Sequence, residues 1–177
     1  MSYALSPLCA AIVIGLAMLS GTHARADTTL AVSGNVVASG CDVDNLDKKV
    51  KIGTFSTKDF PTVGSTTAFK AMNITLSNCY VKLTSVQVKF TGEPNADDPT
   101  LLSLTDTGSG GTVASGLGVE LLDNDGKTIP FNSNVPKTYE LDEGENTLSF
   151  LLRFKSTRYP VTSGEGSAVM CFDLTYQ

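Results

Sequence analysis

Three segments of the chain, 83–91, 147–155 and 167–176, alternate between apolar and polar residues. Because successive side chains of a strand point to opposite faces of a sheet, each segment predicts a strand with one buried face. The alternation slips by one residue after Leu83, and Leu151 interrupts the polar face of its segment. The three apolar rows are Val86, Val88 and Phe90; Leu148, Phe150, Leu152 and Phe154; and Met170, Phe172, Leu174 and Tyr176.

Turn-forming residues separate these apolar runs. The tripeptide Asn-Asp-Gly at 124–126 predicts a hairpin between the apolar segments 119–122 and 128–131. The segments 93–99 and 108–111, rich in Pro, Asp and Gly, predict loops. No segment carries a sustained helical stripe, and no repeat or linker divides the chain. Many short strands in a chain of this length predict an all-β sandwich of two sheets.

An apolar stretch near the N terminus, residues 8–19, is too short to span a bilayer and is followed by Ala24-Arg25-Ala26. This is the pattern of a secretory signal peptide, although no Lys or Arg precedes the apolar stretch. We therefore expect residues 1–26 to be a signal peptide, and a mature chain of 151 residues to begin at Asp27. Loss of Arg25 changes the formal net charge from −5 to −6. No cluster of Lys and Arg stands out, so nucleic acid and anionic membranes are poor candidate partners.

The mature chain offers little for catalysis. Its only histidine, His23, belongs to the expected signal peptide, which argues against the commonest hydrolase and zinc sites. Cys171 could act as a nucleophile, but no histidine is left to activate it. We expect neither an enzyme nor a cofactor.

Two groups of carboxylates invite a functional interpretation. The turn after Asp123 resembles a calcium loop, but Leu121 and Asn132 stand where an EF-hand needs acidic ligands. We interpret it as a turn and expect no metal. The group Asp42, Asp44 and Asp47 could support acid–base chemistry, and we interpret it as an exposed loop.

Three cysteines remain after the expected cleavage: Cys41, Cys79 and Cys171. An exported protein reaches an oxidising compartment, so we expect at least one disulfide. The spacing alone leaves the choice of the pair open.

Four features, taken in chain order, suggest a known family. They are the start of the mature chain (26–37) just ahead of the first cysteine, the segment Ile-x-Leu-x-x-Cys at 74–79, the segment 115–122 with its turn, and a C-terminal pair. In that pair a glycine, Gly164, is fourteenth from the end, and a tyrosine, Tyr176, is next to last. Together they resemble the type 1 pilus subunits of chaperone–usher fimbriae, over nearly the whole mature chain. The closest resemblance is to the minor, adaptor subunits of the fimbrial tip.

The resemblance implies an incomplete immunoglobulin-like sandwich that lacks its final strand. A donor strand fills the resulting groove, first from a periplasmic chaperone and then from the N-terminal extension of the neighbouring subunit. The implied partners are this chaperone, an outer-membrane usher and neighbouring pilins, and the implied route runs through the periplasm to the cell-surface fimbrium. The family also implies the pairing Cys41–Cys79, which would stabilise the fold by about 4 kcal/mol, and leaves Cys171 as a free thiol.

The resemblance assigns residues 27–38 to the donor extension and 39–177 to the pilin domain. Independently, alternation places the apolar residues of the extension on one face. The segment 30–36 could instead be the first strand of a complete sandwich. The expected donor residues are Leu30, Val32, Gly34 and Val36, and the expected groove residues are Gly164, Met170, Phe172, Leu174 and Tyr176.

The expected function is that of a structural subunit that polymerises by donor-strand exchange and supports cell adhesion. A carbohydrate-binding adhesin subunit is the alternative. Tip adhesins of this system usually carry an added lectin domain, for which 151 residues leave no room.

Overall fold

The computed structural model describes residues 40–44, 49–106 and 110–177. They belong to one compact unit, Val37–Gln177. The other unit, Met1–Val36, lies outside the described residues, and so do the expected signal peptide and donor extension. No helix in the described part is long and apolar enough to cross a membrane. The elements are β1 (Asp42–Asp44), a 3₁₀ turn (Thr57–Asp59), β2 (Lys70–Cys79), β3 (Ser85–Gly92), β4 (Leu102–Ser103), β5 (Leu117–Asp123), β6 (Lys137–Glu140), β7 (Gly144–Ser156) and β8 (Met170–Tyr176).

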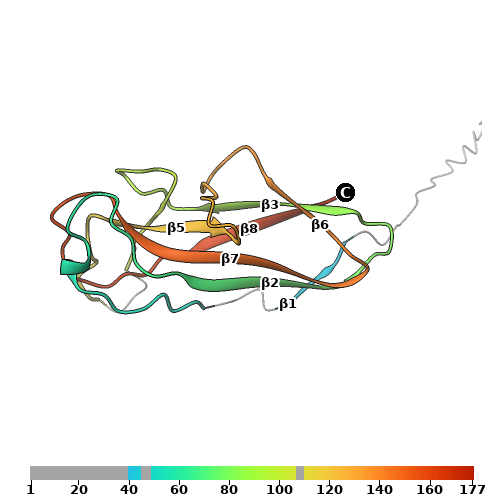
Figure 1. Ribbon diagram of the computed structural model, residues 1–177, viewed down its shortest axis with the longest axis horizontal. Coiled ribbons are helices and arrows are strands. Elements are labelled where there is room, and N and C mark those ends of the chain that lie inside the picture. Colours follow the sequence, from blue (N-terminus) through green and yellow to red (C-terminus); the bar gives the residue numbers. More distant parts are fainter. Residues whose placement is uncertain (1–39, 45–48, 107–109) are drawn as a thin grey trace, which may run out of the picture. The chain divides into compact units, whose positions relative to one another are not determined.

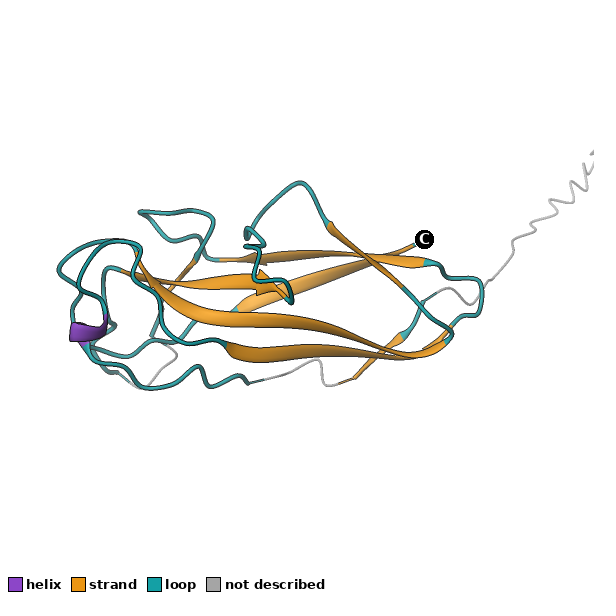
Figure 2. Cartoon of the chain, viewed as in Figure 1, coloured by secondary structure: helices purple, strands orange, loops and turns teal. Residues whose placement is uncertain are grey.

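The strands form two sheets that face each other (Figure 1). One sheet has the order β1-β2-β7-β5-β4, and the other has the order β6-β3-β8. Every strand pair in the two sheets is antiparallel. Strands and loops make up almost all of the described chain (Figure 2), which confirms the predicted all-β sandwich.

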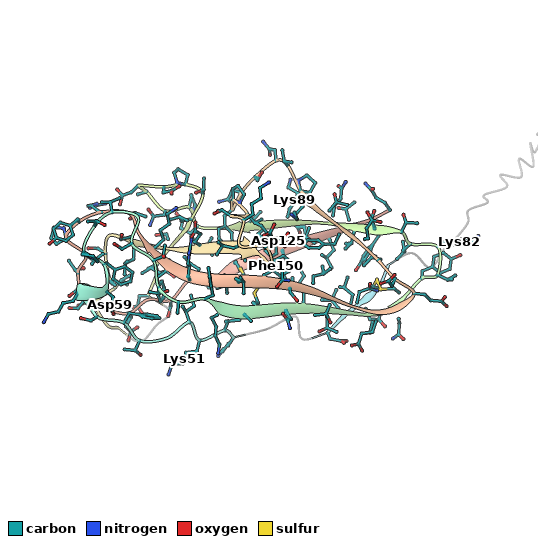
Figure 3. The ribbon with its side chains drawn as sticks, viewed as in Figure 1. Lys51, Asp59, Lys82, Lys89, Asp125 and Phe150 are labelled. Atoms are coloured by element: carbon teal, nitrogen blue, oxygen red, sulfur yellow. A yellow bond between two sulfur atoms is a disulfide. The ribbon has the colours of Figure 1, made fainter. Side chains whose placement is uncertain are left out.

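The core lies between the sheets and contains two of the three predicted apolar rows. The row on β3 and the row on β7 are both buried, and they meet where the ring of Phe90 packs edge-on against Phe150, with centroids 4.9 Å apart. Figure 3 shows Phe150 between the two layers and Lys82 at one end of the sandwich. The third row, on β8, is only half-buried. This difference between the rows singles out β8.

The turn after β5 is where the sequence predicts it. The side chain of Asp123 accepts hydrogen bonds from the backbone N–H groups of Asp125 (3.1 Å) and Lys127 (2.9 Å), and from the ammonium group of Lys137 (2.9 Å). Asp123 therefore stabilises the turn through these hydrogen bonds. The chain then pairs with β5 only at a bridge between Leu122 and Thr128, and Pro130, which has no N–H, cannot extend the ladder.

A buried carboxylate on β5, that of Glu120, forms ion pairs with basic side chains of β7. The Glu120 side chain is 2% exposed and accepts hydrogen bonds from Arg153 (2.6 Å) and Thr128 (3.0 Å), while the Lys155 ammonium lies 3.3 Å away. Burial by itself raises the pKa of Glu120, but the hydrogen bond from Arg153 and the two positive charges outweigh it and hold the pKa below its ordinary value. Glu120 is therefore a structural ion that connects β5 to β7.

Candidate functional site: a groove along β8

Strand β8 lies at the edge of its sheet. It pairs with β3 on one side, and within the described part of the chain no strand pairs with its other side. Its outward residues, including Cys171, are exposed, as the sequence predicts. Its inward residues, Met170, Phe172, Leu174 and Tyr176, contact the core but are only half-buried. An edge strand with a half-covered apolar row is a template for pairing with a further strand.

The segment 49–53 forms the opposite side of the groove. Val50 and Ile52 pack against the core, whereas Lys49 and Lys51 are exposed. This alternation is that of a strand, yet residues 49–53 pair with no strand among the described residues. The segments 49–53 and 166–170 therefore line the same hollow.

Two hollows deepen the groove. The first, about 730 Å³, lies between 49–53 and 166–170, and its floor includes Leu102, Val119 and Leu152 from the larger sheet. The second, about 740 Å³, is lined by the segment 161–167. The ring of Phe154 lines both hollows. The further apolar walls of the second hollow include Phe55, Phe60, Leu104 and Leu117.

Two glycines shape the wall of the second hollow. A Cβ atom at Gly164 would overlap the backbone of residues 112–114 and lie 2.6 Å from the carbonyl carbon of Val113. The two backbones are held this close because Glu165 exchanges hydrogen bonds of 2.8 and 2.9 Å with Thr112 and Ala114. A Cβ atom at Gly166 would lie 3.1 Å from Cζ of Phe154. Only glycine fits at position 164 without a shift of the backbone.

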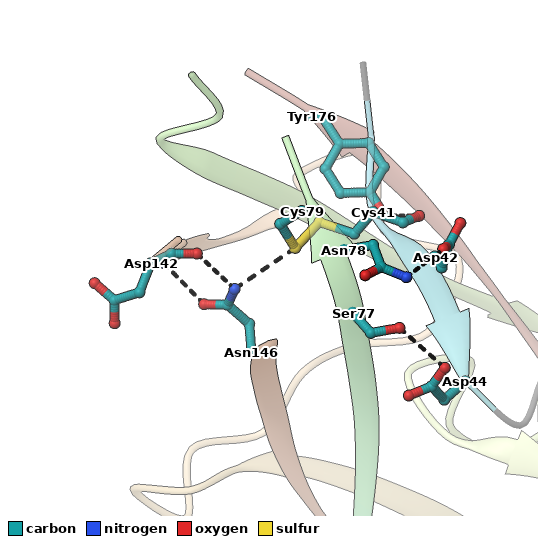
Figure 4. The surroundings of a disulfide bond; sticks show 9 residues. All are labelled: Cys41, Asp42, Asp44, Ser77, Asn78, Cys79, Asp142, Asn146 and Tyr176. Carbon is teal, nitrogen blue, oxygen red and sulfur yellow. Dashed lines mark hydrogen bonds between the residues drawn. A yellow bond between two sulfur atoms is a disulfide. The ribbon is translucent and has the colours of Figure 1, made fainter. Parts of the chain in front are cut away.

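The disulfide joins Cys41 to Cys79, with an S–S distance of 2.08 Å, and confirms the pairing that the family resemblance implied (Figure 4). A bulge at the end of β2 brings Cys79 into place, because Asn78 adopts a left-handed conformation with φ of 50°. The side-chain amide of Asn146 donates to the sulfur of Cys79 at 3.6 Å and to the carbonyl oxygen of Asp142 at 2.8 Å. The disulfide therefore holds β1 beside the end of β2.

Asp42 and Asp44 are exposed, as expected, but they lie on strand β1 rather than in the loop that the sequence suggested. Asp42 accepts a hydrogen bond from the amide of Asn78 (2.9 Å), and Asp44 accepts one from the hydroxyl of Ser77 (3.1 Å). Both bonds connect β1 to β2 (Figure 4). Asp47 lies outside the described residues.

The structure brings the five expected groove residues to one side of the sandwich, along β8 and the segment before it. The expected donor residues Leu30, Val32, Gly34 and Val36 lie outside the described residues. Sequence reasoning missed the opposite side, 49–53, whose alternation of Lys with Val and Ile could have identified it. It also missed Phe154 as a groove residue, since it assigned that ring to the core.

The two facing antiparallel sheets and the open edge at β8 define an immunoglobulin-like sandwich. A model of the family described as "Fimbrial protein" matches residues 30–177. The type-1 fimbrial protein subunit of Serratia marcescens is 32% identical over 185 aligned positions and covers 100% of both chains. The fimbrial-like protein YcbU of Escherichia coli K12 is 40% identical, covering 84% of each chain. The chain therefore belongs to the fimbrial protein family, whose members form surface fimbriae, and it is a structural subunit rather than an enzyme.

A solved structure agrees with this assignment. The crystal structure of the P pilus rod subunit PapA superimposes with a TM-score of 0.65 and 27% identity, over 78% of this chain and 100% of that chain. A chaperone–usher pilus structure, 22% identical with a TM-score of 0.66 over 88% of this chain and 99% of that one, shares the fold.

Proposed function

We propose that this fimbrial subunit polymerises by donor-strand exchange, in which the groove along β8 receives the N-terminal extension of a neighbouring subunit. The observation that carries the proposal is the half-buried apolar row of β8 beside an edge that no described strand covers. A strand added there would pair with backbone on one or both sides and bury the row.

The extension has the composition that such a strand needs. Its apolar residues Leu30, Val32 and Val36 alternate with polar or small ones, so one face of the extended segment is apolar. Before assembly the same groove would be an aggregation hazard. We therefore propose that a periplasmic chaperone covers it during export and that an outer-membrane usher receives the complex. The adaptor position at the fimbrial tip and a role in cell adhesion stay predictions from the resemblance.

A chain that carries its own donor strand tests the proposal. Residues 27–38 are appended after Gln177 through a short flexible linker, because an antiparallel strand can begin beside the end of β8 and needs no long connection. The unmodified mature chain should self-associate or unfold readily, and the complemented chain should be a monomer with a much higher melting temperature.

The matched control appends the same segment with Leu30, Val32 and Val36 each changed to Ser. This segment keeps its length and backbone but loses its apolar face, so it should stabilise the chain far less. If the unmodified chain is already a stable monomer and neither segment changes its melting temperature, the groove does not receive a strand and the proposal is wrong.

A further inference from the structure

Arg153 lies at the centre of a row of side chains on the outer face of the larger sheet. Phe69 comes immediately before β2, where the register between β2 and β7 brings it beside Arg153, and the register between β5 and β7 pairs Arg153 with Glu120. The guanidinium lies over the Phe69 ring, 5.0 Å from its centre, and its Nε donates to Glu120 at 2.6 Å. Three segments far apart in the chain therefore hold this one cation.

These contacts use only part of the guanidinium. The Arg153 side chain is 21% exposed, and neither of its Nη groups has a hydrogen-bond acceptor within the described part of the chain. The two Nη groups form an edge of the guanidinium that can bind a carboxylate through two parallel hydrogen bonds. A largely buried cation therefore keeps an anion-binding edge available to a ligand.

The charges at this point of the surface do not balance. Glu120 is the anionic partner of both Arg153 and the Lys155 ammonium, which lies 3.3 Å from it. One carboxylate beside two cations leaves an excess of one positive charge, in a chain whose formal net charge is −5. A second carboxylate would complete the balance, and the partial burial of both cations would strengthen its attraction.

Apolar surface adjoins the cations. The Phe69 ring is 50% exposed even though the guanidinium lies over it. In the next row along the strands an exposed residue, Ala71, is paired with half-buried Leu151. Leu151 is also the residue that interrupts the polar face of its segment, so the chain departs from simple alternation beside Arg153. The surface therefore suits a ligand that has an apolar part next to its negative charge.

This surface is separate from the groove along β8. The floor of the first hollow includes Val119 and Leu152, which are the sequence neighbours of Glu120 and Arg153. Since successive side chains of a strand point to opposite faces, Glu120 and Arg153 point away from the hollow. A strand added in the groove would therefore leave the surface around Arg153 uncovered.

We propose that Phe69, Arg153 and Lys155 form a binding site for an acidic saccharide. The Nη groups of Arg153 and the ammonium of Lys155 hold the carboxylate, and the Phe69 ring contacts the sugar ring. Uronic and sialic acids carry the carboxylate directly on a pyranose ring, so that a charge and a rigid face of C–H groups lie side by side. An acidic side chain of a protein presents no such face, which favours the saccharide. The inference goes beyond the proposed function and does not depend on strand exchange.

Ligand-observed NMR tests the site. Saturation-transfer difference spectra are recorded for N-acetylneuraminic acid and D-glucuronic acid, with lactose as the neutral sugar. The protein is the complemented chain of the previous subsection, or the unmodified mature chain if that is already a stable monomer. The acidic sugars should receive saturation and lactose should not, and added salt should weaken the binding. If neither acidic sugar receives saturation, or if lactose receives as much, the proposal is wrong.

Two variants locate the binding. Phe69→Ala removes the half-exposed ring and should raise the dissociation constant of the acidic sugars at least about fivefold. Arg153→Lys keeps a positive charge beside Glu120 but lacks the two Nη groups, and should raise it about tenfold or more. Tyr80→Ala is the matched control, because this ring is 40% exposed and follows the far end of β2, and it should bind like the native chain. If the first two variants also bind like the native chain, the site is wrong.

The acidic turn between β6 and β7 tests a protein carboxylate as the occupant. A peptide of residues 140–145 contains Asp142, Glu143 and Glu145, which are exposed in the folded chain. It should bind more weakly than the acidic sugars, because it has no rigid apolar face beside its carboxylates. If it binds Arg153 as tightly as the sugars do, the surface receives a second copy of the chain and the assignment to a saccharide is wrong.

Discussion

The hydroxyl of Tyr176, the next-to-last residue, donates a hydrogen bond to the carbonyl oxygen of Cys41, 3.4 Å away. The same ring lies against Gly40, so the end of β8 and the disulfide-bearing end of the chain are held together (Figure 4). Tyr176 thereby connects the end of β8 to the residues with which the described part of the chain begins.

Two substitutions separate the roles of this tyrosine. Tyr176→Phe removes only a long hydrogen bond and should lower the free energy of unfolding of the complemented chain by less than about 1 kcal/mol. Tyr176→Ala also removes the half-buried ring and should cost about 2 kcal/mol or more. Urea unfolding measures both, and equal losses would show that the ring contributes nothing beyond the hydroxyl.

Gly164→Ala should be among the most damaging small substitutions in the domain. The added methyl group would overlap the backbone of residues 112–114, which cannot yield as a flexible side chain does, and the expected loss is about 2 kcal/mol or more. Gly166→Ala is the comparison, because its methyl group would meet side-chain atoms of Phe154 and Leu104 rather than backbone. A thermal melt in which the two variants unfold at the same temperature would contradict this account.

The buried carboxylate of Glu120 predicts a loss of stability in acid. Its pKa is lower in the folded chain than its ordinary value of 4.5, so the ionised form stabilises the fold above that pH and the stabilisation disappears as pH falls below it. Glu120→Gln leaves Arg153 without its anion and should cost about 3 kcal/mol at pH 7. The free energy of unfolding of the Glu120→Gln variant should change less between about pH 5 and pH 3 than that of the native chain. If the two plots of unfolding free energy against pH are parallel, Glu120 is not a cause of acid unfolding.

Removal of the Tyr139 hydroxyl should not lower the stability of the fold. It is buried, has no hydrogen-bond partner within the described part of the chain, and its pKa is raised to about 12 by burial and by the charge of Asp123. Tyr139→Phe keeps the edge-on contact with Phe150, whose ring centre is 5.7 Å away, and removes an unsatisfied polar group. Denaturant unfolding should show unchanged stability or a gain of up to about 1 kcal/mol. A clear loss would mean that the hydroxyl has a partner.

Gly34 should be the most size-sensitive position of the expected donor extension. Synthetic peptides spanning residues 27–37 are mixed with a chaperone-bound acceptor subunit, and the rate of strand exchange is followed. The Gly34→Phe peptide should exchange much more slowly, because glycine within a strand often marks the close approach of another backbone and overpacking such a site is costly. Asn35→Leu, on the outward face, is the matched control and should exchange at nearly the native rate. Equal rates for Gly34→Phe and the native peptide would show that Gly34 is an ordinary strand residue.

Local pattern was sufficient to predict much of this protein. Alternation identified the rows on β3, β7 and β8 and the faces to which they point, since the period of a strand is a local property. The Asn-Asp-Gly turn after β5 was predicted for the same reason, because it needs only its own residues and the side chain of Asp123. The disulfide pair and the family followed from resemblance, and spacing alone left the pair open.

Only the tertiary structure decided how deeply each row is buried. Alternation is as regular at Met170, Phe172 and Leu174 as at Phe150 and Leu152, yet the first three stay half-buried because β8 has a described partner on one side only. In the same way, nothing in the local sequence shows that the backbone of 112–114 packs against Gly164. Nor does it show that the ring of Phe154, besides contributing to the core, lines both hollows. Burial depends on which segments from elsewhere in the chain, or from a neighbouring molecule, pack against a strand. A local pattern of side chains contains no information about that packing.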